Sequence, residues 1–318
     1  MHLGNVFCAL LSWLSAKSQG GEWVLRIEDL DPQRSRKEYA LQLMDDLQWL
    51  GLPWDGEPVW QSQRGQIYEE YLLRLTEMGL TYPCFCTRAD IMATQAPHET
   101  DGRVVYKGTC RPRDIDAIGA IGAIDAIGAI DSTIRTVPAT TRLIVPDRTI
   151  PFTDGHYGPH PLNLAEHCGD YIIRRKDGAW AYQLAVVVDD ALMGVTEIVR
   201  GRDLLLSSPQ QIHLRELLFG ERKTDSLTTH HPPLTVNFFH HPLLCNAEGQ
   251  RLCKRDKSMD LGYLRNKGTT SQEIIGLLAH LAGLTDTPAP ITPAELLPLF
   301  SWDKVPTEDI ILDKQIML

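Results

Sequence analysis

The chain has 318 residues, of which 43% are hydrophobic and 23% charged, so it is a globular protein long enough for two domains or one core with a large insertion. Its net charge of −10 excludes a protein that coats nucleic acid nonspecifically, although a local basic face can still bind RNA. Seven unevenly spaced cysteines exclude a secreted disulfide framework, and the apolar stretch at residues 6–14 is too short to span a bilayer. We therefore expect a cytoplasmic protein with no membrane partner.

Helices and strands are predicted to alternate at the start of the chain. Apolar residues recur at helical spacing over residues 6–14, and a short strand follows at 23–27. Two more helices are predicted, at 35–51, where a Ser-x-x-Glu capping box begins the helix, and at 65–78. Because strands that alternate with helices form parallel sheets, we expect residues 1–83 to be the first half of an α/β core.

Residues 84–168 differ from this pattern. They show little helical periodicity and are rich in Gly, Pro, Thr and Asp, so we interpret them as a module inserted into the core. Within the module, residues 116–130 repeat five triplets of the form Asp/Gly-Ala-Ile. A period of three residues fits neither a helix nor a strand, and five triplets are too few for a stable solenoid. We expect a simple-sequence expansion in a surface loop.

The α/β pattern returns in residues 169–222, which we expect to be the second half of the core. Three strands are predicted, at residues 171–173, 182–188 and 195–199. The second is expected to be buried on both faces because residues 184–188 are apolar throughout. Asp189 and Asp190 would then be turn or capping carboxylates. A Ser-Pro-Gln-Gln sequence at 208–211 begins a helix.

Two short motifs suit the binding of a nucleotide. The chain begins Met-His-Leu-Gly-Asn, and His2 with Gly4 at the N-terminus of a helix suits a phosphate, because backbone amides and the helix dipole attract the anion. Residues 223–318 contain the second motif, Arg-Leu-Cys-Lys-Arg at 251–255, in a polar loop that precedes two capped helices. This motif is either a solvated charge run or a mobile basic loop that closes over ATP phosphates.

The two motifs resemble the HIGH and KMSKS signatures of class I aminoacyl-tRNA synthetases. Three longer stretches are similar to the glutamate-specific branch of that family, at residues 26–35, 182–190 and 194–204. The resemblance implies a Rossmann-like parallel sheet, interrupted by a zinc-containing insertion and followed by a short helical C-terminal region. It also implies a site for ATP with Mg²⁺, formed by His2, Gly4, Asn5, Lys254 and Arg255. Within that site His2 and Lys254 would be catalytic.

The same resemblance implies three glutamate-binding residues. Glu28, at the end of a predicted strand, would hold the substrate's ammonium group, and Tyr182 would donate its hydroxyl to the substrate. Arg200 would pair with a substrate carboxylate, a task that suits its forked donors. The alternatives are a structural strand-end carboxylate, a buried packing tyrosine, and an ordinary ion pair between Arg200 and Asp203.

Three cysteines and a tyrosine resemble the zinc site of this branch. Cys84, Cys86 and Cys110 supply three thiolates, and three thiolates with one further ligand suit tetrahedral Zn²⁺. By spacing alone His98 is an equally good fourth ligand, whereas the resemblance favours Tyr106. The alternative is three reduced cysteines without a metal. We expect a structural site that holds the insertion.

The shorter members of the family are similar to this chain in length. Too few residues follow Arg255 for the large helical anticodon-binding region of full-length glutamyl-tRNA synthetases. The sequences of residues 182–188 and 202–205 are also similar to those of the truncated branch, the glutamyl-Q tRNA(Asp) synthetases. That branch implies formation of glutamyl-adenylate without tRNA, then transfer of glutamate onto the queuosine base at the wobble position of tRNA(Asp). The partners would be ATP, L-glutamate and the anticodon stem-loop of tRNA(Asp), bound by a monomer.

The chain departs from the family's pattern at two places. The family has a strand before the HIGH-like motif, with an arginine and a serine that help to hold glutamate, whereas this sequence begins at the motif. Either the true start lies upstream of Met1, or that strand and those residues are absent and the backbone of the neighbouring strands is unpaired. The KMSKS-like loop has Arg251 for lysine and Cys253 for serine. Two alternative functions remain: a glutamyl-tRNA synthetase fragment that charges a tRNA 3′ end, and a non-catalytic, zinc-containing RNA-binding protein.

Overall fold

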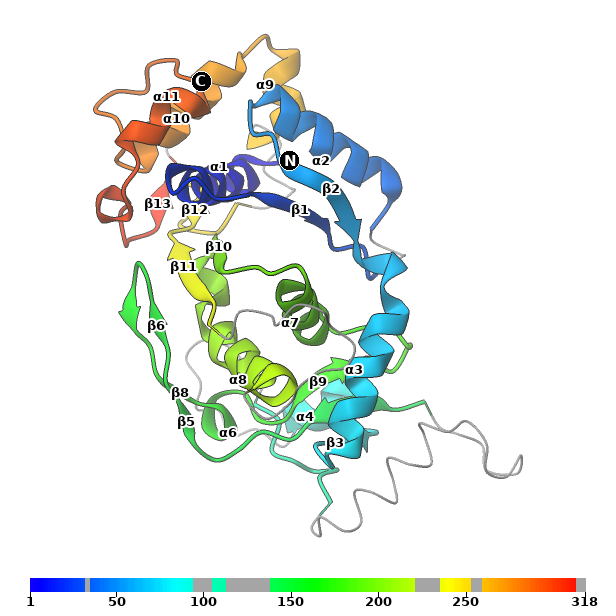
Figure 1. Ribbon diagram of the computed structural model, residues 1–318. Coiled ribbons are helices and arrows are strands. Elements are labelled where there is room, and N and C mark those ends of the chain that lie inside the picture. Colours follow the sequence, from blue (N-terminus) through cyan, green and yellow to red (C-terminus); the bar gives the residue numbers. More distant parts are fainter. Residues whose placement is uncertain (32–34, 94–104, 113–137, 221–234, 253–258, 313–318) are drawn as a thin grey trace.

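A computed structural model describes residues 1–31, 35–93, 105–112, 138–220, 235–252 and 259–312 (Figure 1). The predicted triplet repeat, His98, and the basic residues Lys254 and Arg255 lie outside these residues. No described helix is both long and apolar enough to cross a lipid bilayer.

The first part of the fold pairs two parallel strands. α1 (Leu3–Ser18) leads to β1 (Val24–Ile27), and α2 (Lys37–Trp49) connects β1 to its neighbour β2 (Asp55–Trp60). The predictions of the first helix and strand are confirmed. α1 ends at Ser18, just before the glycines at 20 and 21 that are predicted to end it, and its apolar residues are buried from Leu3 to Leu14.

A second parallel pair follows later in the chain. β10 (Glu197–Gly201) and β11 (Asn237–His241) are paired along their whole length. α1 packs on β10. Two very short strands, β12 (Leu244–Cys245) and β13 (Ile310–Ile311), add a further parallel pair. Parallel pairing therefore dominates this half of the molecule, as the α/β pattern predicts.

The lower half of Figure 1 combines helices with antiparallel strands. The helices are α3 (Gly65–Glu77), α7 (Tyr182–Leu192) and α8 (Ser208–Phe219). An antiparallel sheet has the order β3-β4-β9, formed by β3 (Thr81–Cys84), β4 (Thr140–Leu143) and β9 (Tyr171–Arg174). Shorter elements complete this half: α4 (Arg88–Ala93), β5 (Thr149–Ile150), β6 (Thr153–Asp154), β7 (Gly158–Pro159), β8 (Leu162–Asn163) and α6 (Leu164–His167).

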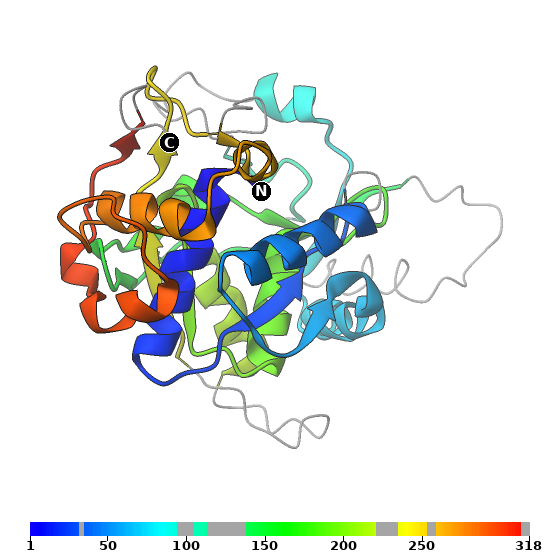
Figure 2. The same ribbon diagram turned by 90° about the horizontal axis from the view of Figure 1, so that it is seen from above.

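Three short helices close the described chain. They are α9 (Leu261–Asn266), α10 (Ser271–Leu281) and α11 (Pro293–Leu296). Capping boxes begin the last two, Thr270 with Glu273 and Thr292 with Glu295, as the sequence predicts. Seen from above in Figure 2, α10 and α11 lie beside α1, so residues from the two ends of the chain pack together.

The buried side chains form two large hydrophobic clusters. The first combines residues 3–52 with residues 244–312, and α1 and α10 supply much of it. The second draws on residues 68–219, chiefly from α3, α7 and α8. A small third cluster contains Tyr82, Cys84 and Tyr106.

Residues 182–188 are helical, so the prediction of a strand there is wrong. α7 is buried on nearly all sides within the second cluster, and a helix in such surroundings is apolar all round. A short, wholly apolar run is therefore compatible with a buried helix or a buried strand. Asp189 and Asp190 are consequently helical and buried, not turn or capping carboxylates.

The capping box predicted from Ser35 and Glu38 is also absent. α2 begins at Lys37, and its N-cap residue Arg36 makes no side-chain cap hydrogen bond. The backbone N–H of Ser35 instead donates to the carbonyl of Asp31, which places Ser35 in the turn before the helix.

Candidate active site

A cavity of about 740 Å³ lies between β1 and β10. Among the described strands, β1 pairs only with β2 and β10 only with β11, so one edge of each is unpaired. Consecutive residues of both strands, 24–26 and 197–200, line the cavity, which shows that their main chains face it. Each free edge presents backbone groups that a further strand can pair with.

The cavity brings together four of the predicted site residues. Asn5 reaches it from α1, Glu28 from the end of β1, Tyr182 from the start of α7, and Arg200 from β10. These residues are far apart in the sequence, and the fold places them around one space.

His2 is the N-cap residue of α1. Its backbone is extended, and its N–H donates to the side-chain oxygen of Asn5 at 3.2 Å. A Cβ atom on Gly4 would lie 3.0 Å from Cε1 of His2, so glycine leaves room for the imidazole beside the first turn. Met1 and Asn5 line the cavity, so the N-terminus of this 16-residue helix lies at one side of it, where the helix dipole favours an anion.

The chain segment that contains the predicted basic loop begins and ends near this helix end. Leu252 and Met259, which flank the loop, belong to the same buried cluster as Leu3. Asp260 forms an antiparallel bridge with His2. The roles of Lys254 and Arg255 remain predictions, because both residues lie outside the described chain.

Arg200 is a buried cation surrounded by neutral acceptors. Its five N–H groups donate to His240 Nε2 at 3.0 Å, Gln211 Oε1 at 2.8 Å, Ser208 Oγ at 2.9 Å, Tyr182 Oη at 3.3 Å and the Leu204 carbonyl at 3.4 Å. In the described part of the chain no carboxylate forms an ion pair with it. The alternative pairing with Asp203 does not occur, since Asp203 pairs with Arg251.

A buried guanidinium without a counter-charge attracts an anion, because desolvation of a charge is costly unless it is paired. A carboxylate that enters the cavity can replace the longer hydrogen bond to Tyr182. The Tyr182 side chain is 38% exposed and lines the cavity, which does not fit a purely packing role. Once the Tyr182 hydroxyl no longer accepts from Arg200, it can donate to the same carboxylate.

Glu28 lies opposite this cation, beside Arg26. Nη2 of Arg26 donates to Glu28 Oε1 at 3.1 Å. Burial of the carboxyl group raises the pKa of Glu28, and the neighbouring Arg26 offsets part of that rise. The carboxylate would be stabilised by a second cation, which a substrate ammonium group can supply.

Two functional neighbours were not predicted, Arg26 and Asp190. Nη1 of Arg26 donates to Asp190 Oδ1 at 2.6 Å, and both residues line the cavity. Asp189, on the next position of α7, is fully buried and accepts hydrogen bonds from Gln61, Arg64 and Tyr68. If residues 182–190 had been predicted to be a buried helix, both aspartates would have been expected inside the fold.

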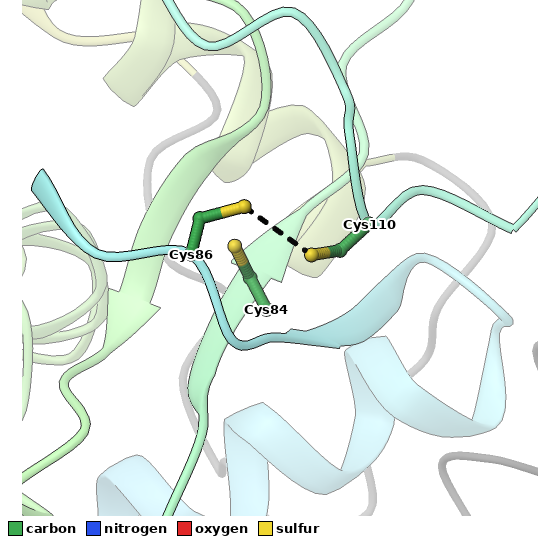
Figure 3. A group of neighbouring side chains, drawn as sticks. All are labelled: Cys84, Cys86 and Cys110. Carbon is green, nitrogen blue, oxygen red and sulfur yellow. Dashed lines mark hydrogen bonds between the residues drawn. The ribbon is translucent and has the colours of Figure 1, made fainter. Parts of the chain in front are cut away.

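The three predicted thiolate ligands meet at the end of β3 (Figure 3). The Sγ atoms of Cys84, Cys86 and Cys110 all lie within 4.8 Å of one another, and those of Cys86 and Cys110 are 3.4 Å apart. Around a tetrahedral Zn²⁺ with bonds of about 2.3 Å, sulfur atoms are about 3.8 Å apart. The cluster can therefore hold a metal ion.

Tyr106 is the described candidate for the fourth ligand. Its hydroxyl lies 3.4 Å from Cys84 Sγ and accepts a hydrogen bond from the N–H of Cys110 at 2.7 Å. The Arg142 guanidinium lies 3.7 Å from the centre of its ring, which fixes the ring's position. Although burial opposes ionisation of Cys110, hydrogen bonds from the Phe85 backbone and Tyr106 lower the pKa of its thiol to about 7. A thiolate ready for a metal follows from this arrangement.

Known proteins resemble the chain along nearly its whole length. The sequence model of the class I tRNA synthetases (E and Q), catalytic domain, matches residues 1–290. A curated glutamyl-Q tRNA(Asp) synthetase of Nitratidesulfovibrio vulgaris is 39% identical, covering 100% of this chain and 93% of the relative. That of Symbiobacterium thermophilum is 41% identical, covering 98% of this chain and 91% of the relative.

Solved structures show the same fold. A glutamate tRNA ligase from Elizabethkingia meningosepticum, in complex with its amino acid, has a TM-score of 0.75 at 24% identity. A glutamate-tRNA synthetase from Elizabethkingia anophelis has a TM-score of 0.76, also at 24% identity. Both likenesses cover 100% of this chain, which spans only 65% and 66% of those two chains. The sequence identity over the whole chain and the fold both indicate a class I synthetase. The chain belongs to the glutamyl-Q tRNA(Asp) synthetases, a family of class I synthetase-like ligases.

Proposed function

We propose that this chain activates glutamate with ATP in the absence of tRNA, then transfers the glutamate to the queuosine base at the wobble position of tRNA(Asp). The observation that carries the proposal is Arg200, a buried guanidinium without a carboxylate partner in the described chain, at a cavity that also presents Glu28 and Tyr182. The names of the relatives support the same reaction.

Each of the three proposed residues binds a different group of the substrate. Arg200 binds a substrate carboxylate, Glu28 binds the ammonium group, and Tyr182 donates its hydroxyl. A charged group at each end of glutamate would fix its position relative to ATP, and such positioning supplies much of the rate in reactions of this kind. Glutamine lacks one carboxylate and would leave the buried guanidinium without its counter-charge.

ATP is proposed to bind at the N-terminus of α1. His2, Gly4 and Asn5 would hold its phosphates, with Lys254 and Arg255 closing over them. The glutamate α-carboxylate oxygen attacks the α-phosphorus, and pyrophosphate leaves with Mg²⁺. A hydroxyl of queuosine then attacks the acyl carbon, and AMP leaves. Lysine and arginine side chains would stabilise the charge that develops on the leaving phosphates.

The metal is proposed to be a structural Zn²⁺ held by Cys84, Cys86, Cys110 and Tyr106. Three thiolates and one oxygen favour zinc over harder cations. Such a site would hold the segment around Cys110 against the end of β3, and so fix the insertion that is proposed to approach the tRNA.

Glutamate-dependent exchange between ATP and pyrophosphate tests the first step. We expect exchange with this chain alone, in the absence of tRNA. Exchange that requires tRNA would indicate a glutamyl-tRNA synthetase fragment instead. No exchange in either condition, with RNA binding retained, would indicate a non-catalytic protein and would contradict the proposal.

Transfer of labelled glutamate tests the second step. We expect label on tRNA(Asp) that contains queuosine, and none on the matched tRNA(Asp) transcript that has guanosine at the wobble position. Nuclease digestion locates the label, which should remain with the anticodon fragment. Label on the 3′-terminal adenosine would contradict the proposed acceptor.

A further inference from the structure

A buried chain of hydrogen bonds runs from β6 to Arg200. Oδ2 of Asp154 accepts from Nδ1 of His240 at 2.6 Å, and Nε2 of His240 accepts from Nε of Arg200 at 3.0 Å. Asp154 and Arg200 are nearly inaccessible to solvent, and His240 is completely so. These groups lie on three strands, β6, β11 and β10.

The donors and acceptors determine the protonation state of His240. A guanidinium can only donate, so Nε2 of His240 must carry a lone pair. The Asp154 carboxylate can only accept when ionised, so Nδ1 must carry the proton. The imidazole is therefore neutral, with its single hydrogen on Nδ1.

Asp154 is held in its ionised form by other donors. The backbone N–H groups of His156 and Tyr157 donate to its Oδ1 at 3.0 and 2.9 Å. Although burial opposes ionisation, the His240 and backbone hydrogen bonds lower the pKa of Asp154. Burial lowers the pKa of His240 despite the neighbouring carboxylate, which also favours the neutral ring.

We propose that Asp154 and His240 are positioning residues that orient the Arg200 guanidinium for the substrate carboxylate. The proposal rests on the function proposed above for Arg200. Asp154 fixes the tautomer of His240, and His240 fixes the plane of the guanidinium through its Nε–H. Nη1 is thereby held toward Tyr182 and Gln211, and Nη2 toward Ser208 and the Leu204 carbonyl. Tyr182 and Leu204 line the cavity.

The arrangement connects the predicted insertion to the glutamate site. Asp154 belongs to the hairpin of β6 and β7, within residues 84–168. The hairpin is fixed against β11 because the N–H of Gly155 donates to the carbonyl of Phe238 at 2.8 Å. A Cβ atom at Gly155 would lie only 2.2 Å from Cε1 of Phe239, so the close approach requires glycine. A segment outside the α/β pattern thus determines the orientation of a substrate-binding arginine.

Protonation of His240 would remove the acceptor that orients the Arg200 guanidinium. An N–H on Nε2 would face the N–H of Arg200, and two cations would be adjacent in a buried place. The charged groups that face the ring are Asp154 of β6, Arg200 of β10 and Asp203 after β10. Because burial lowers the pKa of His240, the KM for glutamate should stay constant through pH 6.5, the ordinary pKa of histidine, and rise only at lower pH, while the KM for ATP stays constant.

Two substitutions of the same residue separate positioning from packing. In His240→Gln the amide oxygen can take the place of Nε2 and still accept from Arg200, whereas in His240→Asn the shorter amide reaches Asp154 and leaves Arg200 without this acceptor. We expect His240→Asn to raise the KM for glutamate by roughly 10- to 100-fold, and His240→Gln to recover most of that loss. Asp154→Asn should raise the same KM, because its amide no longer selects the Nδ1–H tautomer.

His241→Asn is the matched control. His241 is the next residue of β11, so its side chain points to the opposite face, where it is buried against Phe7. We expect it to lower thermal stability without a change in the KM for glutamate. Equal KM values for His240→Asn, His240→Gln and wild type would overturn the proposal, as would a KM increase in His241→Asn as large as that in His240→Asn.

The tautomer can be measured without any activity. The ¹⁵N chemical shifts of labelled histidines, with His240 identified by its loss in His240→Gln, should show a protonated Nδ1 and an unprotonated Nε2 at pH 7. A ring protonated on Nε2 would overturn the inference even in an active enzyme. A wild-type chain without glutamate-dependent exchange would instead refute the proposed function, and the ¹⁵N shifts would still decide the state of His240.

Discussion

Charge at the candidate site is distributed residue by residue, and each group has a defined partner. Arg26 pairs with Asp190 and Glu28, whereas Arg200 donates only to neutral acceptors. The same residue type therefore stands in two settings: Arg26 is paired with two carboxylates, and Arg200 has no carboxylate partner in the described chain. The residues that the resemblance assigns to glutamate were predictable, but the hydrogen-bond partners that orient them were not.

Replacement of Arg200 by lysine tests the role of the forked donors. Arg200→Lys keeps the charge but loses the planar fork, so we expect the KM for glutamate in pyrophosphate exchange to rise roughly 10- to 100-fold with the KM for ATP unchanged. An equal rise in both KM values would indicate a general loss of structure, and no rise would remove Arg200 from the glutamate site.

Removal of Arg26 should make stability depend on pH. Burial raises the pKa of Asp190, and Arg26 opposes that rise. In Arg26→Met the unpaired carboxyl would have a still higher pKa in the folded state, so the folded protein binds more protons than the unfolded one. Stability then falls as pH rises above about 4, the ordinary pKa of aspartate.

Urea unfolding measures this effect. At pH 7 we expect Arg26→Met to lose roughly 3–5 kcal/mol relative to wild type, and clearly less at pH 5. Arg148→Met is the control, because Arg148 forms an exposed pair with Glu216 that should contribute less than about 1 kcal/mol. A loss in Arg26→Met that is the same at both pH values would contradict the explanation.

At the scale of elements, most helices and strands follow from the sequence, and the exceptions have physical causes. The capping boxes at Thr270 and Thr292 and the apolar face of α3 were sufficient to predict their helices. α7 was mistaken for a strand because a fully buried helix loses the polar face that reveals its period. The short strands β5 to β8 have two residues each, too few for an alternating pattern to appear.

The contact of the β6–β7 hairpin with β11 can be tested at Gly155. An added methyl group in Gly155→Ala would force the hairpin away from Phe239 and carry Asp154 with it. We expect a lower melting temperature and a higher KM for glutamate. Gly158→Ala, in the same hairpin, should cost only about 1 kcal/mol of backbone strain, because its Cβ would meet open space. Its KM should stay at the wild-type value.

The cysteine cluster should determine metal content. We expect about one zinc per chain by elemental analysis, and little zinc with a lower melting temperature in Cys84→Ser, because one thiolate is lost from a four-coordinate site. Cys168→Ser, which changes a cysteine outside the cluster, should keep the metal. A purified wild-type chain that remains zinc-free after exposure to the metal would contradict a zinc site.

At the scale of the whole molecule, the two large clusters are joined across a polar layer. Arg26 of β1 belongs to the side of the first cluster and Asp190 of α7 to the second, and their ion pair lies at the cavity between β1 and β10. The fold class was predictable from the alternation of elements and from the resemblance. The association of residues 3–52 with residues 244–312 was not, because amphipathic patterns do not identify which apolar faces meet.

That association has a consequence for the chain during its synthesis. α1 is made early, yet part of its apolar surface is covered by helices encoded roughly 250 residues later. At about 5–20 residues per second, a ribosome needs roughly 12–50 s to produce them. Throughout that interval the apolar surface of α1 that packs against those helices stays uncovered, and it can bind chaperones that recognise apolar segments at the exit tunnel. The order of synthesis thus delays completion of the cluster around α1, where ATP is proposed to bind, until the C-terminal helices have emerged.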